Sequence, residues 1–250
     1  MGNARQGLYL TWLGQAGYVV ELAGQRLAID PYLSDSVTRL APELARLYPP
    51  PLEPSALQVD ALLVTHDHLD HLDPETIGAL PRPWPTFIGP RNVRRHLLAL
   101  DVPAERIVQV DAGDEVTWQG ITVRATFAIP NEETVLDSVG FLLSVAGQPC
   151  LYHSGDTAYH PFLHYLAHYR PPVALLCING KYGNMGYEQA AQLARALGVR
   201  VAIPNHYDLF ALNSEDPERF RAALTGASCT EVLIPRLNEP YDLSAYLEDH

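Results

Sequence analysis

One stretch of six residues constrains this chain more than any other. Three imidazoles and two carboxylates stand between His66 and His71, in the order His-Asp-His-Leu-Asp-His. The apolar run 61–64 before it is typical of a buried strand. Asp73 and Pro74 after it are typical of a helix start, with Asp73 as the N-cap. The cluster is therefore predicted in a turn at the carboxyl end of a strand, where open α/β sheets usually place ligand sites.

Such a cluster is costly to hold together unless something compensates its charge. Imidazole and carboxylate groups that crowd in a turn lose hydration, and that loss is expensive for unpaired groups. A divalent cation explains the crowding, because neutral imidazole and ionised carboxylate are both good ligands for it. The alternative is a solvated, histidine-rich turn. The metal interpretation is favoured because residues of the same kind recur downstream.

The bulk composition fits a folded domain and disfavours several classes of partner. The 250 residues are 47% hydrophobic and 18% charged, which suffices for a sizeable core. The formal net charge of −12 would repel a nucleic acid, and no basic patch counters it, so nucleic-acid partners are disfavoured. No segment resembles a signal peptide or a membrane span, and the three cysteines are widely spaced. We therefore expect a cytoplasmic protein without a membrane partner.

The chain in order alternates short strands with a few helices. Strands are expected at residues 8–13, 18–21, 27–30, 61–64, 86–88, 107–110, 115–118, 121–127, 139–145, 150–153, 173–178, 199–204 and 231–235. Helices are expected at residues 74–80, 91–100 and 187–197, at a short piece near 43–48, and from Pro217 onward. The proline-rich loop 34–58 is expected to form a rim of the site. This count suggests two packed sheets flanked by helices.

The pattern His-x-His-x-Asp-His resembles the signature of the metallo-β-lactamase-fold hydrolases. The resemblance implies an α/β fold, the four-layer αββα sandwich, with two divalent metal ions. The first two histidines, His66 and His68, would bind one ion. Asp70 and His71 would bind the second, whereas Asp67 has no ligand role in this pattern and is interpreted as a turn residue.

The resemblance also assigns two residues further along the chain. Asp156 lies in a Gly-Asp-Thr turn after a predicted strand and would bridge the two ions. His206 follows the predicted strand 199–204 and would bind the second ion. One domain spans the chain in this prediction, with residues 8–236 as its core and 237–250 as a polar tail. Asp30, at a strand end before Pro31, is interpreted either as a hydrogen-bond support for a ligand or as a turn-former.

Within the superfamily, the chain is most similar to the L-ascorbate-6-phosphate lactonase group, over segments 12–17, 65–73, 86–107 and 153–210. One departure matters. Many superfamily members place a third histidine for the first ion after the strand at 121–129, and this chain has none there. Glu132 is the candidate replacement, and an oxygen ligand would shift the preference from zinc towards manganese. The alternatives are a solvent-facing acidic loop, a weak first site, or a single bound ion.

The predicted activity is hydrolysis of a lactone or related ester of an anionic substrate, such as a sugar phosphate. The ions would supply hydroxide near neutral pH, and Asp70 would orient it. Candidate substrate-binding residues are Lys181, Tyr182, Asn184 and Tyr207. Lys181 is the only lysine of the chain, and a flexible ammonium suits a phosphate or carboxylate.

Two other functions stay open at this point. A phosphodiesterase or phospholipase-D-like hydrolase would use the same ions on a phosphorus centre. A metal-binding protein without catalysis would bind ions but turn over no ester. The partner in the favoured prediction is a small molecule, and the resemblance suggests a homo-oligomer, for which the sequence shows no decisive hydrophobic seam.

Overall fold

The structure is a computed structural model that describes residues 7–130, 135–226 and 229–248. Over these residues, fourteen strands form two seven-stranded sheets. The first sheet contains β1 (Leu8–Gly14), β2 (Gly17–Leu22), β3 (Gln25–Ile29), β4 (Ala61–Leu63), β5 (Thr86–Gly89), β6 (Ile107–Gln109) and β14 (Pro240–Asp242). The second contains β7 (Glu115–Trp118), β8 (Ile121–Phe127), β9 (Val139–Val145), β10 (Gln148–His153), β11 (Val173–Cys177), β12 (Val201–Asn205) and β13 (Glu231–Val232).

The helices are short, and most of them connect neighbouring strands. The α-helices are α1 (Ser36–Leu40), α2 (Pro74–Ala79), α3 (Arg91–Ala99), α4 (Tyr187–Leu197) and α5 (Pro217–Leu224). Short 3-10 helices occupy Pro42–Leu44, Pro54–Ala56, Ala104–Arg106, Pro161–His168 and Ser244–Leu247. Among the residues described, no helix combines the length and the apolar character needed to cross a bilayer.

Both sheets follow the same plan. The first has the strand order β14-β1-β2-β3-β4-β5-β6, antiparallel from β14 to β3 and parallel from β3 to β6. The second has the order β13-β12-β11-β10-β9-β8-β7, antiparallel from β7 to β10 and parallel from β10 to β13. The two halves of the chain are therefore alike in topology, although no repeat is evident in the sequence.

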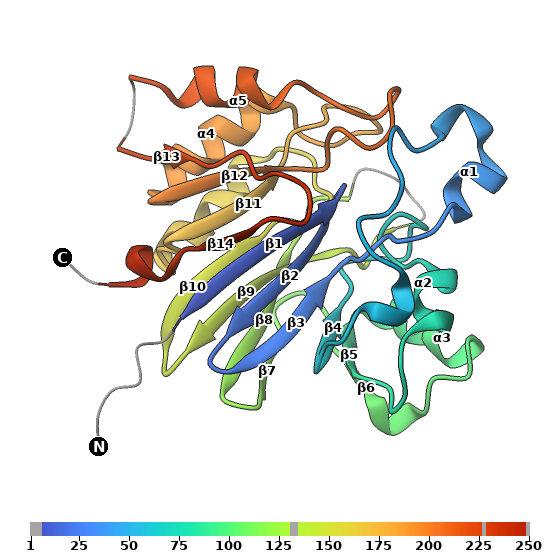
Figure 1. Cartoon of the computed structure of the whole chain (residues 1–250). Coiled ribbons are helices and arrows are strands. Elements are labelled where there is room, and N and C mark those ends of the chain that lie inside the picture. The colour runs from blue at the N-terminus through green and yellow to red at the C-terminus, as the bar shows by residue number, and fades with distance from the viewer. Residues whose placement is uncertain (1–6, 131–134, 227–228, 249–250) are drawn as a thin grey trace.

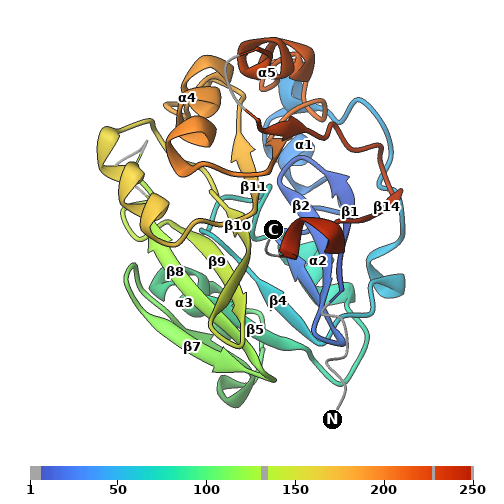
Figure 2. The same ribbon diagram turned by 90° about the vertical axis from the view of Figure 1, so that its left-hand side faces the viewer.

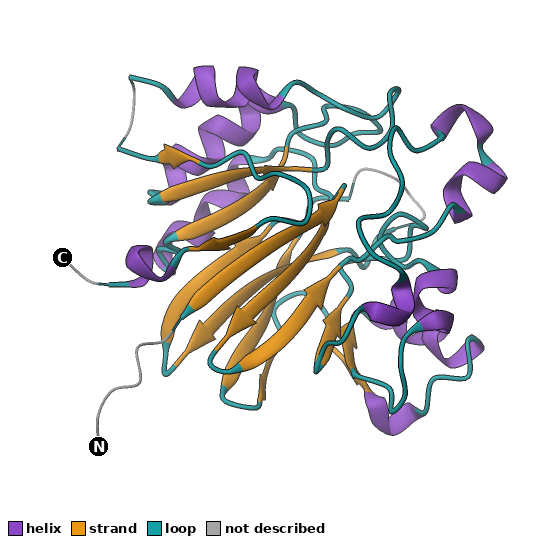
Figure 3. Cartoon of the chain, in the orientation of Figure 1, coloured by secondary structure: helices purple, strands orange, loops and turns teal. Residues whose placement is uncertain are grey.

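The two sheets pack face to face between two layers of helices. Helices α2 and α3 lie on the outer side of the first sheet, and α4 and α5 lie on the outer side of the second (Figures 1 and 3). Strand β4 shows how one strand packs against the other sheet on one face and against helices on the other. Ala61 and Leu63 belong to the core between the sheets, whereas Leu62 packs with Ile77 of α2 and Val93 of α3. Because alternate side chains face opposite sides of a strand, only a fully apolar strand fits two cores. The predicted αββα sandwich is confirmed.

Two segments differ from the sequence-based expectation. Within the expected polar tail, β14 pairs antiparallel with the outer edge of β1, with Leu10 opposite Tyr241 (Figure 2). The edge of β1 would otherwise leave backbone groups unpaired, and a three-residue strand beginning with proline gives little sequence signal. In the loop 34–58, the expected helix at 43–48 is absent from the described structure. The helix α1 stands earlier instead, and Pro42 begins a separate 3-10 turn.

Candidate metal centre

The predicted ligands come from turns that follow three different strands. His66, His68, Asp70 and His71 lie after β4, Asp156 lies after β10, and His206 lies after β12. The parallel parts of the sheets bring these carboxyl ends to one end of the sandwich. The side chains form two groups there: His66 with His68 and Asp156, and Asp70 with His71 and His206. Within each group the nearest ligand atoms all lie within 4.8 Å of one another.

Asp30 fixes the position of the histidine turn. Its Oδ1 accepts a hydrogen bond from the Thr65 backbone N–H at 2.8 Å, and its Oδ2 accepts from Thr65 Oγ1 at 2.6 Å. Its Oδ2 also lies 2.8 Å from His71 Nδ1. An ionised carboxylate only accepts, so His71 carries its proton on Nδ1 and presents Nε2 to the cluster. The interpretation of Asp30 as a hydrogen-bond support is confirmed.

The turn after β10 places Asp156 between the two groups. Gly155 has φ of +59°, and a Cβ at this position would stand 2.6 Å from the carbonyl oxygen of Val139, so only glycine fits. Asp156 Oδ1 lies 3.4 Å from His71 Nε2, and its Oδ2 lies 3.3 Å from His206 Nε2. Asn184 Nδ2 donates a hydrogen bond of 2.7 Å to Oδ2 of Asp156. Asp156 therefore lies close to members of both groups.

The donor set fits divalent cations. His71 Nε2 and Asp156 Oδ1 are buried and lie 3.4 Å apart, but neither forms a hydrogen bond. Each unsatisfied buried polar group costs roughly 1–3 kcal/mol, so two of them in one cluster need a physical cause. Imidazole nitrogen and carboxylate oxygen, in groups of three, are the ligands that zinc and manganese accept. A cation in each group would satisfy the unpartnered atoms.

Charges within the cluster oppose the effect of burial. Burial disfavours the charged form of His71, but the carboxylates of Asp156 and Asp70 outweigh it and raise the pKa of this imidazole to about 9. The same balance raises the pKa of His206 to about 10. Burial also favours the neutral acid at Asp70 and Asp156, yet the neighbouring imidazoles hold the pKa of both carboxyls below the usual range. The two carboxylates thus attract positive charge into the cluster.

His66 differs from the other imidazoles. Burial, and then the charge of His71, lower the pKa of His66 well below its ordinary value. His66 is therefore neutral, which is the form that binds a metal ion. Its Nε2 lies 3.0 Å from Nδ1 of His68, a separation close to that between two ligand atoms of one ion.

A cavity of about 150 Å³ opens onto these ligands. Its walls come from the loop that contains α1, the loop between β11 and α4, and the loop after β12. The lining residues are Val37, Leu44, His68, Asp70, Asp156, Tyr182, Asn184, His206, Phe210 and Asn213. The expectation that the loop 34–58 forms a rim of the site is confirmed by Val37 and Leu44.

The structure separates the four candidate substrate-binding residues. Tyr182 and Asn184 line the cavity, and the exposed Lys181 directly precedes Tyr182 without lining it. The prediction that Tyr207 contacts the substrate is corrected. Its side chain is buried and its ring stacks on Trp12, with 4.9 Å between the centroids. The turn after β12 directs His206 into the cavity and its neighbour into the core, so Tyr207 is not placed for contact with a substrate.

Glu132 and Asp67 are the remaining acidic residues that the sequence analysis singled out. Glu132, the candidate third ligand of the first ion, lies outside the described residues. Asp67 belongs to neither ligand group, and its Oδ2 lies 3.1 Å from Nε2 of His96 on α3. The absence of a ligand role for Asp67 agrees with the pattern, but its partner is a side chain rather than the backbone of its own turn.

The sequence did not reveal several residues that complete the site. Gln15, in the turn between β1 and β2, donates from Nε2 to Asp70 Oδ2 at 3.0 Å. Phe210 and Asn213 line the cavity from the loop after β12. A single long polar side chain in the small-residue turn Gly-Gln-Ala-Gly was the available signal for Gln15. The other two residues carried no signal, because only packing of the loops places them.

Comparisons with known proteins agree with this geometry. A family model described as "Beta-lactamase superfamily domain" matches residues 25–207. A UPF0173 metal-dependent hydrolase of Methanosarcina mazei is 30% identical over 245 residues, which cover 94% of this chain and 99% of the relative.

Two solved structures share the fold along nearly the whole chain. Igni18, a metallo hydrolase from Ignicoccus hospitalis, has a TM-score of 0.78 at 23% identity and covers 95% of this chain and 98% of its own. An isothiocyanate hydrolase from Delia radicum gut bacteria has a TM-score of 0.78 at 22% identity, covering 95% and 99%. From its family match and its relatives, the chain belongs to the metallo-β-lactamase superfamily and is a metal-dependent hydrolase.

Proposed function

We propose that this hydrolase cleaves a small ester or lactone whose other end carries an anionic group. One observation carries the proposal: two groups of ligand atoms, with Asp156 between them, lie at a cavity too small for a polymer. A cavity of about 150 Å³ accommodates the carbonyl and a few neighbouring atoms of a substrate. The remainder of the substrate stays at the mouth.

The ligand groups define what each residue would hold. His66, His68 and Asp156 would bind one divalent ion, and Asp70, His71 and His206 would bind the other. Bound ions of this kind lower the pKa of water to near neutrality and polarise a carbonyl oxygen. Zinc and manganese both suit the mixed nitrogen and oxygen donors. A single bound ion is the simpler version of the same proposal.

Asp70 is the proposed catalytic residue. It lines the cavity, and the neighbouring imidazoles keep its carboxyl ionised by lowering its pKa. An ionised carboxylate at this position accepts a hydrogen bond from the attacking water and fixes its direction of approach. Asn184 holds Asp156 by its hydrogen bond of 2.7 Å, so the carboxylate does not swing away between turnovers.

The remaining walls suit an uncharged reacting group. Val37, Leu44 and Phe210 supply apolar surface, and the amide of Asn213 can hydrogen-bond a hydroxyl or carbonyl oxygen. The cavity has room for the reacting group but not for the remainder of the substrate. We therefore place the anionic group of the substrate outside, beside the exposed ammonium of Lys181, which precedes the lining residue Tyr182.

A substrate panel tests the reaction after elemental analysis has identified the bound metal. Neutral lactones, lactones with a phosphate or carboxylate group, aryl esters and bis-4-nitrophenyl phosphate are compared with zinc and with manganese. We expect the anionic lactones to have the highest kcat/KM. Faster turnover of the phosphodiester would reject ester hydrolysis in favour of phosphoryl chemistry. Stoichiometric metal with no turnover on any member would favour a binding protein.

The Lys181→Met variant tests the position of the anionic group. We expect the KM of anionic substrates to rise about ten-fold with kcat nearly unchanged, because an interaction made equally in ground and transition states is lost. The KM of matched neutral substrates should stay constant. The matched control is Arg236→Met, which removes an exposed cation from the C-terminal segment. An equal rise of KM for neutral and anionic substrates would contradict this placement.

A further inference from the structure

We infer that Gln15 is a positioning residue of the metal centre, which holds Asp70 through its carboxamide and His206 through its backbone carbonyl, across the two sheets. Asp70 follows β4 of the first sheet, whereas His206 follows β12 of the second. Both belong to the same ligand group. The inference rests on the metal positions of the proposed function, and it does not depend on which substrate is cleaved.

The side chain of Gln15 lies between these two ligands. Gln15 is completely buried, and its Nε2 donates a hydrogen bond of 3.0 Å to Asp70 Oδ2. The same nitrogen lies 3.2 Å from both ring nitrogens of His206, so it contacts the edge of this imidazole between them. Because an ionised carboxylate only accepts hydrogen bonds, the amide nitrogen must be the end that faces Asp70. The other end, Oε1, is buried without a hydrogen-bond partner. The amide is thus oriented by the metal centre alone.

The backbone of the same turn is fastened to the second sheet. The carbonyl oxygen of Gln15 accepts hydrogen bonds from Trp12 Nε1 at 3.0 Å and from the His206 backbone N–H at 3.3 Å. The next carbonyl, that of Ala16, lies 3.1 Å from Nε2 of His153 at the end of β10. The turn between β1 and β2 therefore contacts the ends of both strands that deliver second-sheet ligands. It sets the distance between the two halves of the site.

The backbone conformation of Gln15 comes from the tight turn between β1 and β2. Gln15 has φ of +50°, and Ala23, Gln119 and Ala146 in the other short hairpin turns have φ of 51°, 48° and 50°. Short hairpin turns require positive φ, so the inference depends on the contacts of Gln15 and not on its backbone conformation.

Loss of the amide should loosen one ion and spare the other. Removing hydrogen-bond partners of metal ligands typically weakens metal binding by about 10- to 100-fold. We expect this loss for the ion held by Asp70, His71 and His206. Among the described residues, Gln15 has no hydrogen bond to His66, His68 or Asp156, so an ion held by these three residues should keep its affinity.

The experiment compares Gln15→Met with a matched control, Gln192→Met, on the exposed face of α4. Metal-free protein is titrated with zinc and with manganese against a competing chromophoric chelator. Gln15→Met, which keeps the length but has no donor, should weaken one of the two bound equivalents by about 10- to 100-fold and leave the other unchanged. Gln192→Met should bind as the parent protein does. Where turnover is measurable, kcat should fall while KM stays the same.

Two further variants keep the inference open to refutation. Gln15→Asn suits the left-handed backbone but is one methylene too short to reach Asp70, so it should lose affinity even if Gln15→Met folds poorly. Gln15→Glu keeps the length and should also lose affinity, because it cannot donate to a carboxylate. Parent-like metal affinity in Gln15→Met would overturn the inference. Parent-like or tighter metal affinity in Gln15→Glu would also overturn it, because residue 15 would then act as a metal ligand. Weakened metal binding in a protein that cleaves no ester would reject the substrate proposal and leave the inference standing.

Discussion

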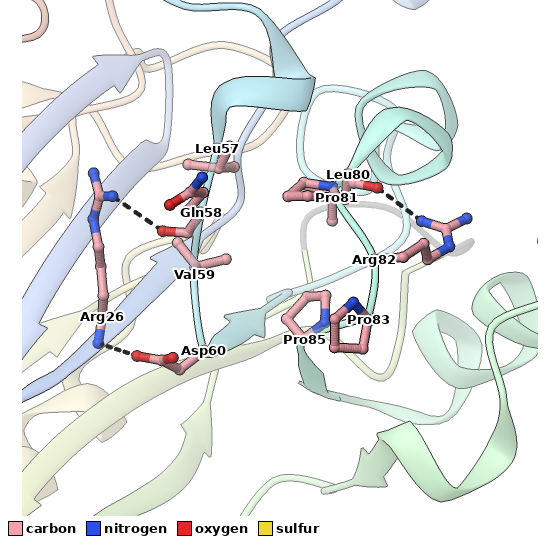
Figure 4. A pocket seen from close by; sticks show the side chains of 10 residues that line it. All are labelled: Arg26, Leu57, Gln58, Val59, Asp60, Leu80, Pro81, Arg82, Pro83 and Pro85. Atoms are coloured by element: carbon pink, nitrogen blue, oxygen red, sulfur yellow. Dashed lines mark hydrogen bonds between the residues drawn. The ribbon is translucent and has the colours of Figure 1, made fainter.

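Two hollows at opposite ends of the first sheet differ in the state of their polar groups. The larger, of about 420 Å³, lies at the amino ends of β3, β4 and β5 (Figure 4). It is lined by Arg26, Leu57, Gln58, Val59, Asp60, Leu80, Pro81, Arg82, Pro83 and Pro85. The smaller, of about 150 Å³, lies at the carboxyl ends of the strands and is lined in part by four candidate metal ligands, His68, Asp70, Asp156 and His206.

In the larger hollow the polar groups are paired with one another. The Arg26 backbone N–H donates to Asp60 Oδ2 at 2.9 Å, and its guanidinium donates to the carbonyl oxygen of Gln58 at 3.1 Å. Arg82 donates to the carbonyl oxygen of Leu80 at 2.8 Å. None of the ten residues described as lining this hollow has a buried polar side-chain atom without a partner.

In the smaller cavity the opposite holds. His71 Nε2, Asp156 Oδ1 and Gln15 Oε1 are buried at this end of the sheet without a hydrogen bond. Burying such groups costs free energy, but isolated examples also occur elsewhere, as at Tyr207 Oη and Asn205 Oδ1. The comparison teaches that converging imidazole and carboxylate groups identify the reactive end of this molecule, and that volume does not.

The largest expected effect is that of Asp156→Ala. This carboxylate stands between both ligand groups, so its loss should lower kcat/KM by at least about a thousand-fold and reduce the bound metal. Steady-state kinetics and elemental analysis measure the two effects. The control is Asp60→Asn in the larger hollow, which should behave as the parent protein does. Undiminished turnover by Asp156→Ala would show that the reaction does not take place at the smaller cavity.

Removal of the metal should destabilise the fold measurably. Ions present at about a thousand times their dissociation constant contribute roughly 4 kcal/mol, which corresponds to a fall of about 10 °C in Tm for a chain of this size. Thermal unfolding before and after dialysis against a chelator measures the shift. Addition of the metal should restore the original Tm. The same Tm with and without metal would mean that the unpartnered atoms are satisfied by something else.

A smaller effect is expected for Asp30→Asn, which alters the hydrogen bonds of Asp30 to His71 and to Thr65. The amide has a single acceptor oxygen in place of two, so it cannot satisfy both Thr65 and the imidazole. We expect the metal affinity of the Asp70, His71 and His206 group to fall about 10- to 100-fold. Competition with a chelator measures it. Unchanged affinity would show that Thr65 alone orients the turn.

The smallest effect is expected for Asp60→Asn itself. Its carboxylate accepts an exposed backbone hydrogen bond from Arg26, and such a contact contributes about 0.5–1 kcal/mol. Urea unfolding should detect a change of this size, while kcat/KM stays constant. A loss of activity in this variant would link the two ends of the sheet and abolish the distinction between them.

The sequence by itself determined the local features of this protein. Asp73 caps α2, with its side chain accepting from the Glu75 backbone N–H as predicted. Gly198 ends α4 in the left-handed conformation, with φ of +65°. The crowded histidine turn after β4 was recognisable from its own residues, and the Gly-Asp turn before Thr157 was recognisable from its resemblance to the superfamily motif. Each depends on the chemistry of residues within one turn of chain, and that chemistry is written in consecutive positions.

Only the tertiary structure decided which distant groups meet. It directed Tyr207 into the core against Trp12 and brought β14 to the edge of β1. It also placed Gln15 between Asp70 and His206. These relations depend on how two sheets pack and on which way a turn directs its side chains. Packing is set by the summed contacts of the whole core, so no short stretch of sequence specifies it.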